Sequence, residues 1–243
     1  MSDVTLLIDP ERFDGRELRV EGDPYKHLFR ARRLGVGDRI RVVDGAGRAR
    51  WSEVVKIDRQ TAVLGLGEPA PSNEPELRLD LLVPTLRPER ASWLVEKATE
   101  VGVAAIRFLH TERAPRDFGA GTLGRLRRVT AAALEQCQGS RLPALTGPHE
   151  WSELAVLTAG FAERWVLDLP LSRGSGGRVG EGAGGEGLAL LVGPEGGWSD
   201  RERGELRAAG WRTVELGERV LRAETAAVVG AAVLLLDRKS KSL

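Results

Sequence analysis

Two stretches near the end of the chain place charged side chains where an apolar strand gives way to a helix. In "LLVGPEGGWSD", residues 190–200, Glu195 stands between a proline and two glycines directly after the apolar run. In "LGERVLRAETAAVVGAAVLLL", residues 216–236, Glu and Arg side chains crowd the start of an alanine-rich helix. Because glycine allows a ligand to lie against bare backbone, both strand ends predict a small-molecule pocket read by peptide N–H and C=O groups.

Each stretch also has a purely structural interpretation. Ser199 and Glu202 have the spacing of a capping box, so the first stretch is typical of a strand-to-helix turn. Glu224 or Thr225 can cap the second helix, with the other charges in surface ion pairs. The familiar phosphate-binding glycine motifs and the G-x-S-x-G elbow are missing, which argues against a pyrophosphate site and against a serine hydrolase.

Composition places the chain among ordinary globular proteins and excludes several classes of function. The 243 residues are 42% hydrophobic and 29% charged, and Cys137 is the only cysteine, so no internal disulfide can form. The three histidines lie far apart, which predicts no metal site. The first residues lack a secretory pattern and the most apolar run, residues 226–236, is too short to cross a bilayer, so we expect a cytoplasmic protein without membrane attachment.

One segment is strongly basic, although the net charge of +1 offers no general attraction for a polyanion. Residues 26–50 hold eight Lys and Arg residues against Asp38 and Asp44. Such a run fits either phosphate contacts to a nucleic acid or the solvated face of a basic protein. The basic residues are Lys26, Arg30, Arg32, Arg33, Arg39, Arg41, Arg48 and Arg50.

The pattern of the first 72 residues predicts a small β domain. Residues 39–57 alternate apolar and polar side chains around a glycine-containing loop, which predicts a β-hairpin, and residues 61–67 predict a further strand. Residues 68–76 carry three prolines among polar residues and cannot continue a helix or a central strand. We therefore expect one domain at residues 1–72 and a second at residues 73–243.

Strand and helix patterns alternate through the second domain. This alternation predicts an α/β fold with a mostly parallel sheet covered by helices on both faces, and ligand sites in such sheets lie at the carboxyl ends of the strands. Residues 172–187 are glycine-rich and are expected to form a surface excursion. Strands are expected at residues 77–83, 103–110, 164–169, 188–193 and 211–216, and helices at residues 88–102, 121–137, 150–159, 200–209 and 223–237.

Several blocks, spread over most of the chain, follow the pattern of one known family. They are "LLVGPEGGWSDRE" and "LGERVLRAETAAVVGAAVL", with "EKATEVGV" (96–103), "TERA" (111–114), "ALEQCQGSRLP" (133–143) and "HLFRARRLGVGDRIRVVDG" (27–45) upstream. Together they closely resemble the bacterial small-subunit ribosomal RNA uracil-N3 methyltransferases of the SPOUT superfamily. The chain departs from the family pattern at Gln138 and Gly139, at Ala223 and in the 172–187 insert.

The resemblance implies a fold, a cofactor and an assembly. The expected fold is a PUA-like β-barrel that binds RNA, followed by a SPOUT-type α/β domain with a C-terminal trefoil knot, in a homodimer. S-adenosyl-L-methionine is the implied methyl donor, and Glu195 is expected either to accept from its ribose or amine or to hold the loop. The expected cofactor-binding residues are Leu169, Leu191, Val192, Gly193, Glu195, Gly196, Gly197, Leu216, Gly217, Arg219, Val220, Leu221 and Thr225.

The implied reaction is methylation of uridine N3 in ribosomal RNA within the small ribosomal subunit. Because N3 must lose its proton before it attacks, Arg222 is expected to stabilise the uracil anion and Glu224 or Glu135 to take the proton. N3 lies on the Watson–Crick edge, so the target base must be unpaired or flipped out. The expected RNA contacts are Lys26, Arg30, Arg32, Arg33, Arg48, Arg50, Arg113, Arg116 and Arg141, with Arg125, Arg127 and Arg128 also near phosphates.

Two alternatives remain open at this point. One is a SPOUT methyltransferase that acts on another RNA position, such as a ribose 2′-hydroxyl. The other is a non-catalytic ribosome-assembly factor that binds RNA and has no need of the cofactor. The blocks at residues 27–45 and 133–143 favour the uridine-N3 branch, and cofactor binding would separate an enzyme from an assembly factor.

Overall fold

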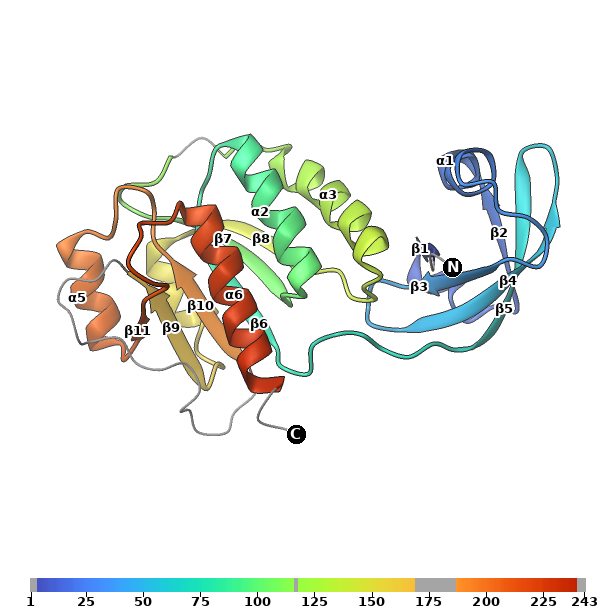
Figure 1. Cartoon of the computed structure of the whole chain (residues 1–243). Coiled ribbons are helices and arrows are strands. Elements are labelled where there is room, and N and C mark those ends of the chain that lie inside the picture. The colour runs from blue at the N-terminus through green and yellow to red at the C-terminus, as the bar shows by residue number, and fades with distance from the viewer. Residues whose placement is uncertain (1–3, 116–117, 169–186, 240–243) are drawn as a thin grey trace. The chain divides into compact units, whose positions relative to one another are not determined.

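The computed structural model describes residues 4–115, 118–168 and 187–239, with side chains through residue 236. The chain forms two compact units, drawn in Figure 1. The first comprises Met1–Glu74 and Ala131–Leu142, and the second comprises Pro75–Thr130 and Pro143–Leu243. The chain therefore returns once to the first unit, through a segment that the sequence alone groups with the second domain. Apart from Gly187, the expected 172–187 excursion lies outside the described residues.

The first unit is built on a five-stranded sheet with the order β1-β3-β4-β5-β2. Its paired strands run antiparallel except β1 and β3, which are parallel. The expected hairpin is confirmed, because β3 pairs with β4 in an antiparallel register from Arg39↔Glu53 to Val43↔Ala49. The elements are β1 (Val4–Leu7), the 3-10 helix η1 (Pro10–Arg12), β2 (Glu17–Glu21), α1 (Gly22–Tyr25), the π-helix η2 (Lys26–Ala31), β3 (Arg39–Val43), β4 (Ala49–Ile57) and β5 (Thr61–Pro69).

Alternation along these strands separates a core from an outer face. Residues such as Ile40, Val54 and Leu64 form the inner core and are fully buried. On the outer face, Val43 packs in a second cluster with Leu134 of α3 (Thr122–Cys137). The C-terminal part of α3 is thus built into the first unit.

The second unit has a six-stranded sheet with the order β11-β9-β10-β6-β7-β8, and all of its strand pairs are parallel. The expected parallel sheet is confirmed. Among the described helices none is long and apolar enough to span a membrane. The strands are β6 (Leu79–Pro84), β7 (Ala105–His110), β8 (Ala144–Glu150), β9 (Glu163–Leu167), β10 (Leu188–Val192) and β11 (Arg212–Val214), and the helices besides α3 are α2 (Pro88–Val101), the 3-10 helix η3 (Trp151–Glu153), α4 (Leu154–Leu157), α5 (Asp200–Ala208) and α6 (Ala223–Lys239).

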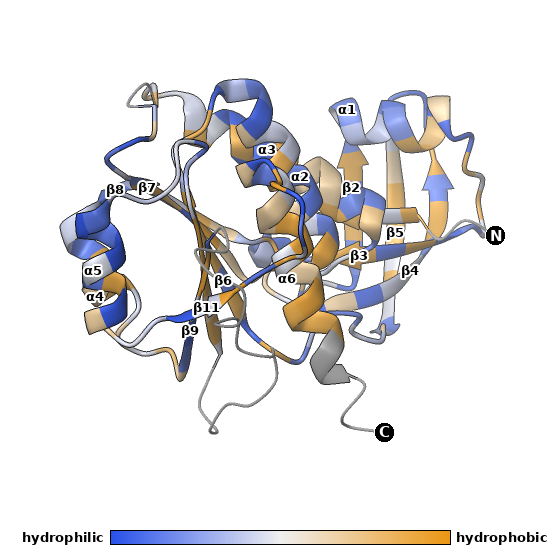
Figure 2. Cartoon of the chain, turned by 60° about the vertical axis from the view of Figure 1, so that its left-hand side comes forward, coloured by the Kyte–Doolittle hydropathy of each residue, from blue (hydrophilic) through white to orange (hydrophobic). Residues whose placement is uncertain are grey.

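Side chains of the central strands alternate between two apolar layers. Leu190 and Val192 of β10 join the core that contains α2 and α6, whereas Leu191 joins the core that contains α4 and α5. Figure 2 shows α2, α3 and α6 on one side of this sheet and α4 and α5 on the other. A strand buried on both faces has a continuous apolar sequence, which is why residues 188–193 were predictable as a strand.

Two features of the sheet differ from the sequence expectation. Strand β8 was not expected, because Gly147 and Pro148 interrupt a segment whose residues are mostly half-buried or exposed. Strands β10 and β11, whose ends were expected to form a pocket, are not neighbours in the sheet, because β9 lies between them and pairs with both. Three strand ends therefore meet at this edge of the sheet instead of two.

Candidate active site

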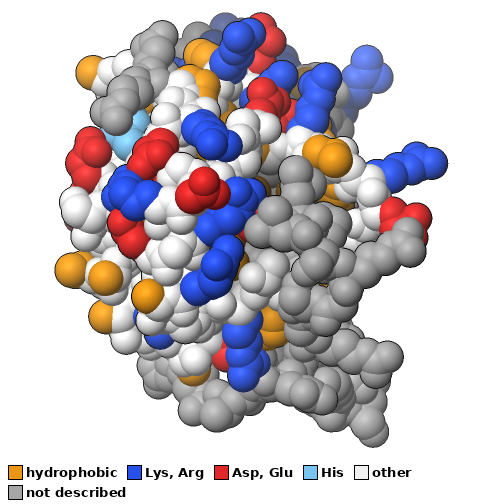
Figure 3. Space-filling model, turned by 90° about the vertical axis from the view of Figure 1, so that its left-hand side faces the viewer, with side chains coloured by type: hydrophobic (Ala, Val, Ile, Leu, Met, Phe, Trp, Pro, Cys, Tyr) orange, Lys and Arg blue, Asp and Glu red, His pale blue; other side chains and the backbone are white. Residues whose placement is uncertain are grey.

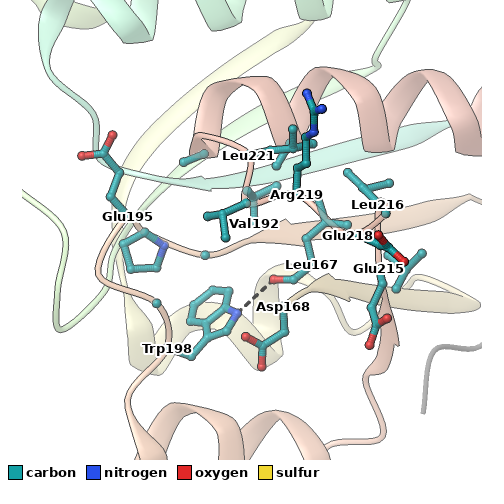
Figure 4. Close-up of a pocket in the computed structure, with 18 residues that line it drawn as sticks. Leu167, Asp168, Val192, Glu195, Trp198, Glu215, Leu216, Glu218, Arg219 and Leu221 are labelled. Carbon is teal, nitrogen blue, oxygen red and sulfur yellow. Dashed lines mark hydrogen bonds between the residues drawn. The ribbon is translucent and has the colours of Figure 1, made fainter. Parts of the chain in front are cut away.

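A cavity of about 350 Å³ lies at the carboxyl ends of β9, β10 and β11. Neighbouring parallel strands end at the same edge of a sheet, so the turns that follow them converge there. Figure 4 shows the side chains around the cavity. The lining residues are Leu167, Asp168, Val192, Gly193, Pro194, Glu195, Gly197, Trp198, Val214, Glu215, Leu216, Gly217, Glu218, Arg219, Val220, Leu221, Ala223 and Ala226.

Trp198 forms one wall of the cavity and explains the glycines beside it. Its side chain is 1% exposed, and its Nε1 donates to the backbone carbonyl of Leu167 at 3.1 Å, the dashed bond in Figure 4. A Cβ on Gly193 would lie 3.0 Å from two atoms of the indole, closer than a side chain normally approaches. Gly197 has a φ of 69°, a left-handed conformation that glycine adopts without strain. These glycines therefore allow the turn to close over Trp198.

Asp168 places a carboxylate at the cavity. Its two oxygens accept hydrogen bonds from Arg203 of α5, at 3.0 and 3.2 Å, and its side chain is 12% exposed. The hydrogen bond to Asp168 raises the pKa of Arg203, so the arginine stays charged. Leu169, the residue expected at this strand end, lies outside the described residues, and Asp168 was not among the expected cofactor residues. An acidic residue directly after an apolar strand is the signal that could have pointed to it. No group of three His, Cys, Asp or Glu side chains in the described part of the chain could hold a metal ion.

The carboxylate of Glu195, which lies among turn-forming residues, pairs with an arginine of α2. Figure 4 shows its side chain turned away from Trp198 and Asp168. Its Oε1 accepts a hydrogen bond from Nη1 of Arg90, in the first turn of α2. Nε of the same arginine lies 3.7 Å from Oε1 of Glu224. Nothing in the sequence singled out Arg90, because an arginine near the start of an amphipathic helix is common.

Most of the expected cofactor residues come together at the cavity. Leu191 does not, because it neighbours Val192 on a strand and must face the opposite apolar layer. Gly196 and Thr225 are not among the lining residues either. Those that line the cavity are Val192, Gly193, Glu195, Gly197, Leu216, Gly217, Arg219, Val220 and Leu221. Besides Asp168, sequence reasoning missed Leu167, Pro194, Trp198, Val214, Glu215, Glu218, Ala223 and Ala226.

None of the three expected catalytic residues is among those that line the cavity. Arg222 is exposed and directly precedes α6. Glu224, in the first turn of α6, is 6% exposed, and its Oε2 has no hydrogen-bond partner among the described residues. Glu135 belongs to the first unit, where its Oε1 accepts from the N–H of Leu7 at 2.9 Å. Arg222 and Glu224 therefore flank a cavity wall, whereas Glu135 holds strand β1.

Charged groups also tie the turn after β7 to the start of α5. The expected capping box is confirmed, since Ser199 accepts from the N–H of Glu202 and Glu202 accepts from the N–H of Ser199. The second oxygen of Glu202 accepts from the N–H of Glu112 at 3.0 Å. A hydrogen bond of 2.6 Å from Arg201 lowers the pKa of the Glu112 carboxyl. Figure 3 shows the face that carries α5, where acidic and basic side chains are interspersed.

Two arginines of the basic segment serve the fold of the first unit. Arg41 is 5% exposed, contrary to its expected place in an exposed patch. Arg50 is half-buried. A guanidinium whose donors are taken by carbonyls has few left for phosphate. Arg41 donates to the carbonyls of Pro71, Gln138 and Gly139 and to the side chain of Asn73, and Arg50 donates to the carbonyls of Phe13, Gly15, Leu66 and Gly67.

The other expected RNA contacts are mostly exposed. Arg48 pairs with two carboxylates, Asp44 at 2.6 Å and Asp14 at 2.9 Å. Arg113, in the second unit, donates to the carbonyl of Gly196 at 2.8 Å. Arg116 lies outside the described residues. The exposed members of the first unit are Lys26, Arg30, Arg32, Arg33, Arg48 and Arg141.

Comparison with known protein families defines the class of this protein. Residues 73–235 match the family described as the RNA methyltransferase domain, and residues 20–66 match the RNA methyltransferase PUA domain. The chain belongs to the RNA methyltransferase domain family. Its cavity at the carboxyl edge of the sheet lies within the matched residues.

Individual relatives agree with this class. The chain is 29% identical over 231 residues to a ribosomal RNA small subunit methyltransferase E of Synechocystis sp., a match that covers 93% of this chain and 75% of the relative. A probable rRNA-methyltransferase from Porphyromonas gingivalis has the same fold, with a TM-score of 0.81 and 24% identity over 97% of this chain and 99% of the other. A ribosomal RNA small subunit methyltransferase E from Neisseria gonorrhoeae, bound to S-adenosyl methionine, has a TM-score of 0.80 and 22% identity over 96% of both chains.

Proposed function

We propose that this protein transfers a methyl group from S-adenosylmethionine to N3 of a uridine in small-subunit ribosomal RNA. The cavity at the ends of β9, β10 and β11 carries the proposal, because the two stretches that resemble uridine-N3 methyltransferases supply most of its lining. Membership of the RNA methyltransferase family makes RNA the methyl acceptor. The names of the Synechocystis and Neisseria relatives point to small-subunit ribosomal RNA.

The residues of the cavity fit this cofactor. A volume of about 350 Å³ suits a ligand of this size. Trp198, Leu167 and Val192 provide apolar walls, and the backbone of the glycine-containing turns provides hydrogen-bonding groups. Asp168, whose charge is paired with Arg203, adds carboxylate oxygens that can accept further hydrogen bonds from the amine or ribose of the ligand. When bound, the cofactor supplies a methyl group already activated by its sulfonium, so the chain must mainly align the acceptor and exclude water.

Removal of the proton from uridine N3 falls to residues beside the cavity wall. We assign to Arg222 the stabilisation of the uracil anion, because a guanidinium near the carbonyl oxygens favours the charged form. Glu224 and Glu135 are the two candidates to take the proton. The contacts favour Glu224, since its Oε2 has no hydrogen-bond partner among the described residues while Glu135 already accepts from Leu7.

The first domain, residues 1–72, is assigned to RNA binding as a PUA-like barrel, and residues 73–243 to catalysis. The match of residues 20–66 to an RNA methyltransferase PUA domain supports this division. The exposed side chains of Lys26, Arg30, Arg32 and Arg33 are suited to phosphate contacts. Selection by RNA shape would then present an unpaired or flipped-out uridine to the cavity.

A homodimer and a C-terminal trefoil knot complete the proposal. Val229, Val233 and Leu236 of α6 are 38%, 40% and 66% exposed, and Trp93 of α2 is 42% exposed. An exposed apolar face of this kind supports docking of a second copy of the chain. The knot is proposed on the family resemblance alone. The general rules of chain connection would not suggest it, because knotted chains are rare. A substrate in the small ribosomal subunit would place the enzyme in the cytoplasm.

The experiment that tests the proposal is methyl transfer to small ribosomal subunits from a strain that lacks the enzyme. Purified protein and methyl-labelled S-adenosylmethionine are incubated with these subunits, and the nucleosides are mapped by mass spectrometry. Labelled 3-methyluridine at one position supports the proposal, whereas label on a ribose 2′-hydroxyl assigns a different target. Absence of both label and cofactor binding would favour the assembly-factor alternative. Unchanged turnover in an Arg222→Ala variant would remove that residue from the mechanism.

A further inference from the structure

We propose that Arg90 is a positioning residue that joins the two cavity-forming stretches and thereby holds the pocket in its binding shape. The identity of the pocket's ligand rests on the proposed function, but the joining role rests on contacts within the chain. Arg90 itself is not among the residues that line the cavity. It would therefore act through the residues that it holds.

The guanidinium of Arg90 faces two carboxylates that are distant in the sequence. Nη1 donates to Oε1 of Glu195, in the turn after β10. Nε lies 3.7 Å from Oε1 of Glu224, in the first turn of α6. Because the two contacts use different edges of one planar group, a single side chain of α2 connects both stretches.

Because Glu224 is buried, its carboxylate needs a compensating partner, and Arg90 is positioned to be that partner. The side chain of Glu224 is 8% exposed, and that of Arg90 is 29% exposed. A buried carboxylate is costly unless a cation or hydrogen-bond donors compensate its charge. Among the described residues, Arg90 is the ion-pair partner of Glu224. Without it, the Glu224 carboxylate would be buried with no compensating cation among the described residues, so it must move and the start of α6 would shift with it.

Both anchored carboxylates belong to cavity walls. Glu195 is itself a lining residue, and Ala223 and Ala226 line the cavity on either side of Glu224 in the sequence. One wall follows β10 and the other follows β11, so the Arg90 contacts set the spacing between walls from different strands. Small changes in such spacing have large effects on binding and catalysis. Lysine is a poor substitute, because its donors radiate from a single atom.

The test compares the wild type with Arg90→Ala, Arg90→Lys and the control Arg87→Ala. Arg87 is exposed and immediately precedes α2, so its removal changes the charge but neither contact. Hydrogen–deuterium exchange is measured for residues 193–197 and 218–225, and the Kd of S-adenosylmethionine by calorimetry. We expect Arg90→Ala to speed exchange in both segments and to raise the Kd about tenfold. Arg90→Lys should recover less than half of the effect, and Arg87→Ala should change neither.

A double-mutant cycle with Glu195→Gln adds a second criterion. If Arg90 acts through Glu195, the effects of the two substitutions on the Kd should be clearly less than additive. Faster exchange in only one segment, a uniform loss of protection throughout the second unit, or additive effects would overturn the inference. Exchange is measured without ligand, so a wild type that fails to bind S-adenosylmethionine would refute the proposed function while the exchange data still decide the role of Arg90.

Discussion

The cavity of the second unit and the basic segment of the first were both predicted from residues that lie close together in the sequence. In the structure, most of the predicted cavity residues line one pocket, whereas the basic residues divide into buried and exposed side chains. At the cavity, residues from two stretches converge because parallel strands end at a common edge. In the basic segment, Arg41 is buried and donates hydrogen bonds to backbone carbonyls, whereas Arg33 is exposed. Sheet topology forces strand ends to meet, whereas a run of charges does not specify which side chains face inward.

The largest expected effect is that of Arg41→Ala on the stability of the first unit. The substitution removes the Arg41 donor from the carbonyls of Pro71 and Gly139 and from Oδ1 of Asn73, leaves the carbonyl of Gln138 with Asn73 as its remaining donor, and empties a buried volume. We expect the free energy of unfolding to fall by about 3 kcal/mol. Urea denaturation measures it.

Arg33→Ala is the matched control for that comparison. It removes the same charge from an exposed position in the same unit, so stability should change by less than about 0.5 kcal/mol. Equal losses in the two variants would mean that the division into structural and exposed arginines is mistaken.

The second effect is that of Gly193→Val on cofactor binding. Its side chain would collide with the Trp198 indole, which lies 3.0 Å from the Cβ position, and would intrude into the cavity. We expect binding of S-adenosylmethionine to weaken by about 2 kcal/mol, roughly 30-fold. Calorimetry provides the measurement, with Gly204→Ala as control because a Cβ there meets nothing within 4 Å. Normal affinity in the valine variant would show that this turn does not border the ligand.

The fold was largely predictable where a local sequence pattern has a single physical explanation, such as burial of both faces of a strand or capping of a helix. Strand β10 is apolar throughout because both faces are buried, and the Ser199 capping box appears in the letters of the sequence. Strand β8 was missed because it has few buried residues to reveal it. The position of β9 between β10 and β11 is a property of long-range pairing that no local pattern carries.

The candidate site was predictable to a similar degree. Turn residues marked the two stretches, but Asp168, which lines the cavity, and its partner Arg203 lie 35 positions apart and share no motif. Arg90 was missed for the same reason, since its partners are known only after folding. Leu191 belongs to the motif but does not line the cavity, because a motif is contiguous in sequence while a strand alternates its faces.

The third effect is the pH-dependent contribution of the buried carboxylate Asp44 to the stability of the first unit. Burial alone would raise the pKa of Asp44, but hydrogen bonds from the Arg48 side chain and from the N–H groups of Ala46 and Arg48 outweigh it, so the pKa of this carboxyl is lowered on folding. A carboxyl with a lowered pKa in the folded state adds stability above its unfolded pKa of about 4, and the contribution is lost as the pH falls through the folded value.

Asp44→Asn should therefore lower the free energy of unfolding by about 1.5 kcal/mol at neutral pH and by less at pH 3. Urea denaturation at the two pH values gives both numbers. A variant that loses the same stability at each pH would assign the effect to packing instead of to charge.

The smallest expected effect is that of Arg33→Gln on RNA binding, and it tests the exposed arginines of the basic segment. Arg33 is exposed, and its side chain makes no hydrogen bond or ion pair within the described residues, so its charge is available to phosphate. Arg33→Gln keeps a long polar side chain on the same backbone. It should weaken RNA binding about two- to threefold and reduce the slope of log K against log salt by about 1.

Arg207→Gln tests whether position or net charge is responsible for that loss. Arg207 is exposed on α5, in the second unit, and its replacement changes the total charge by the same amount. Filter-binding titrations over a range of salt concentrations compare the two variants. If both lose the same affinity and slope, the RNA responds to the overall charge, and the basic segment has no special place in recognition. A loss confined to Arg33→Gln would locate the phosphate contacts on the first unit, where composition suggested them but could not choose among the arginines.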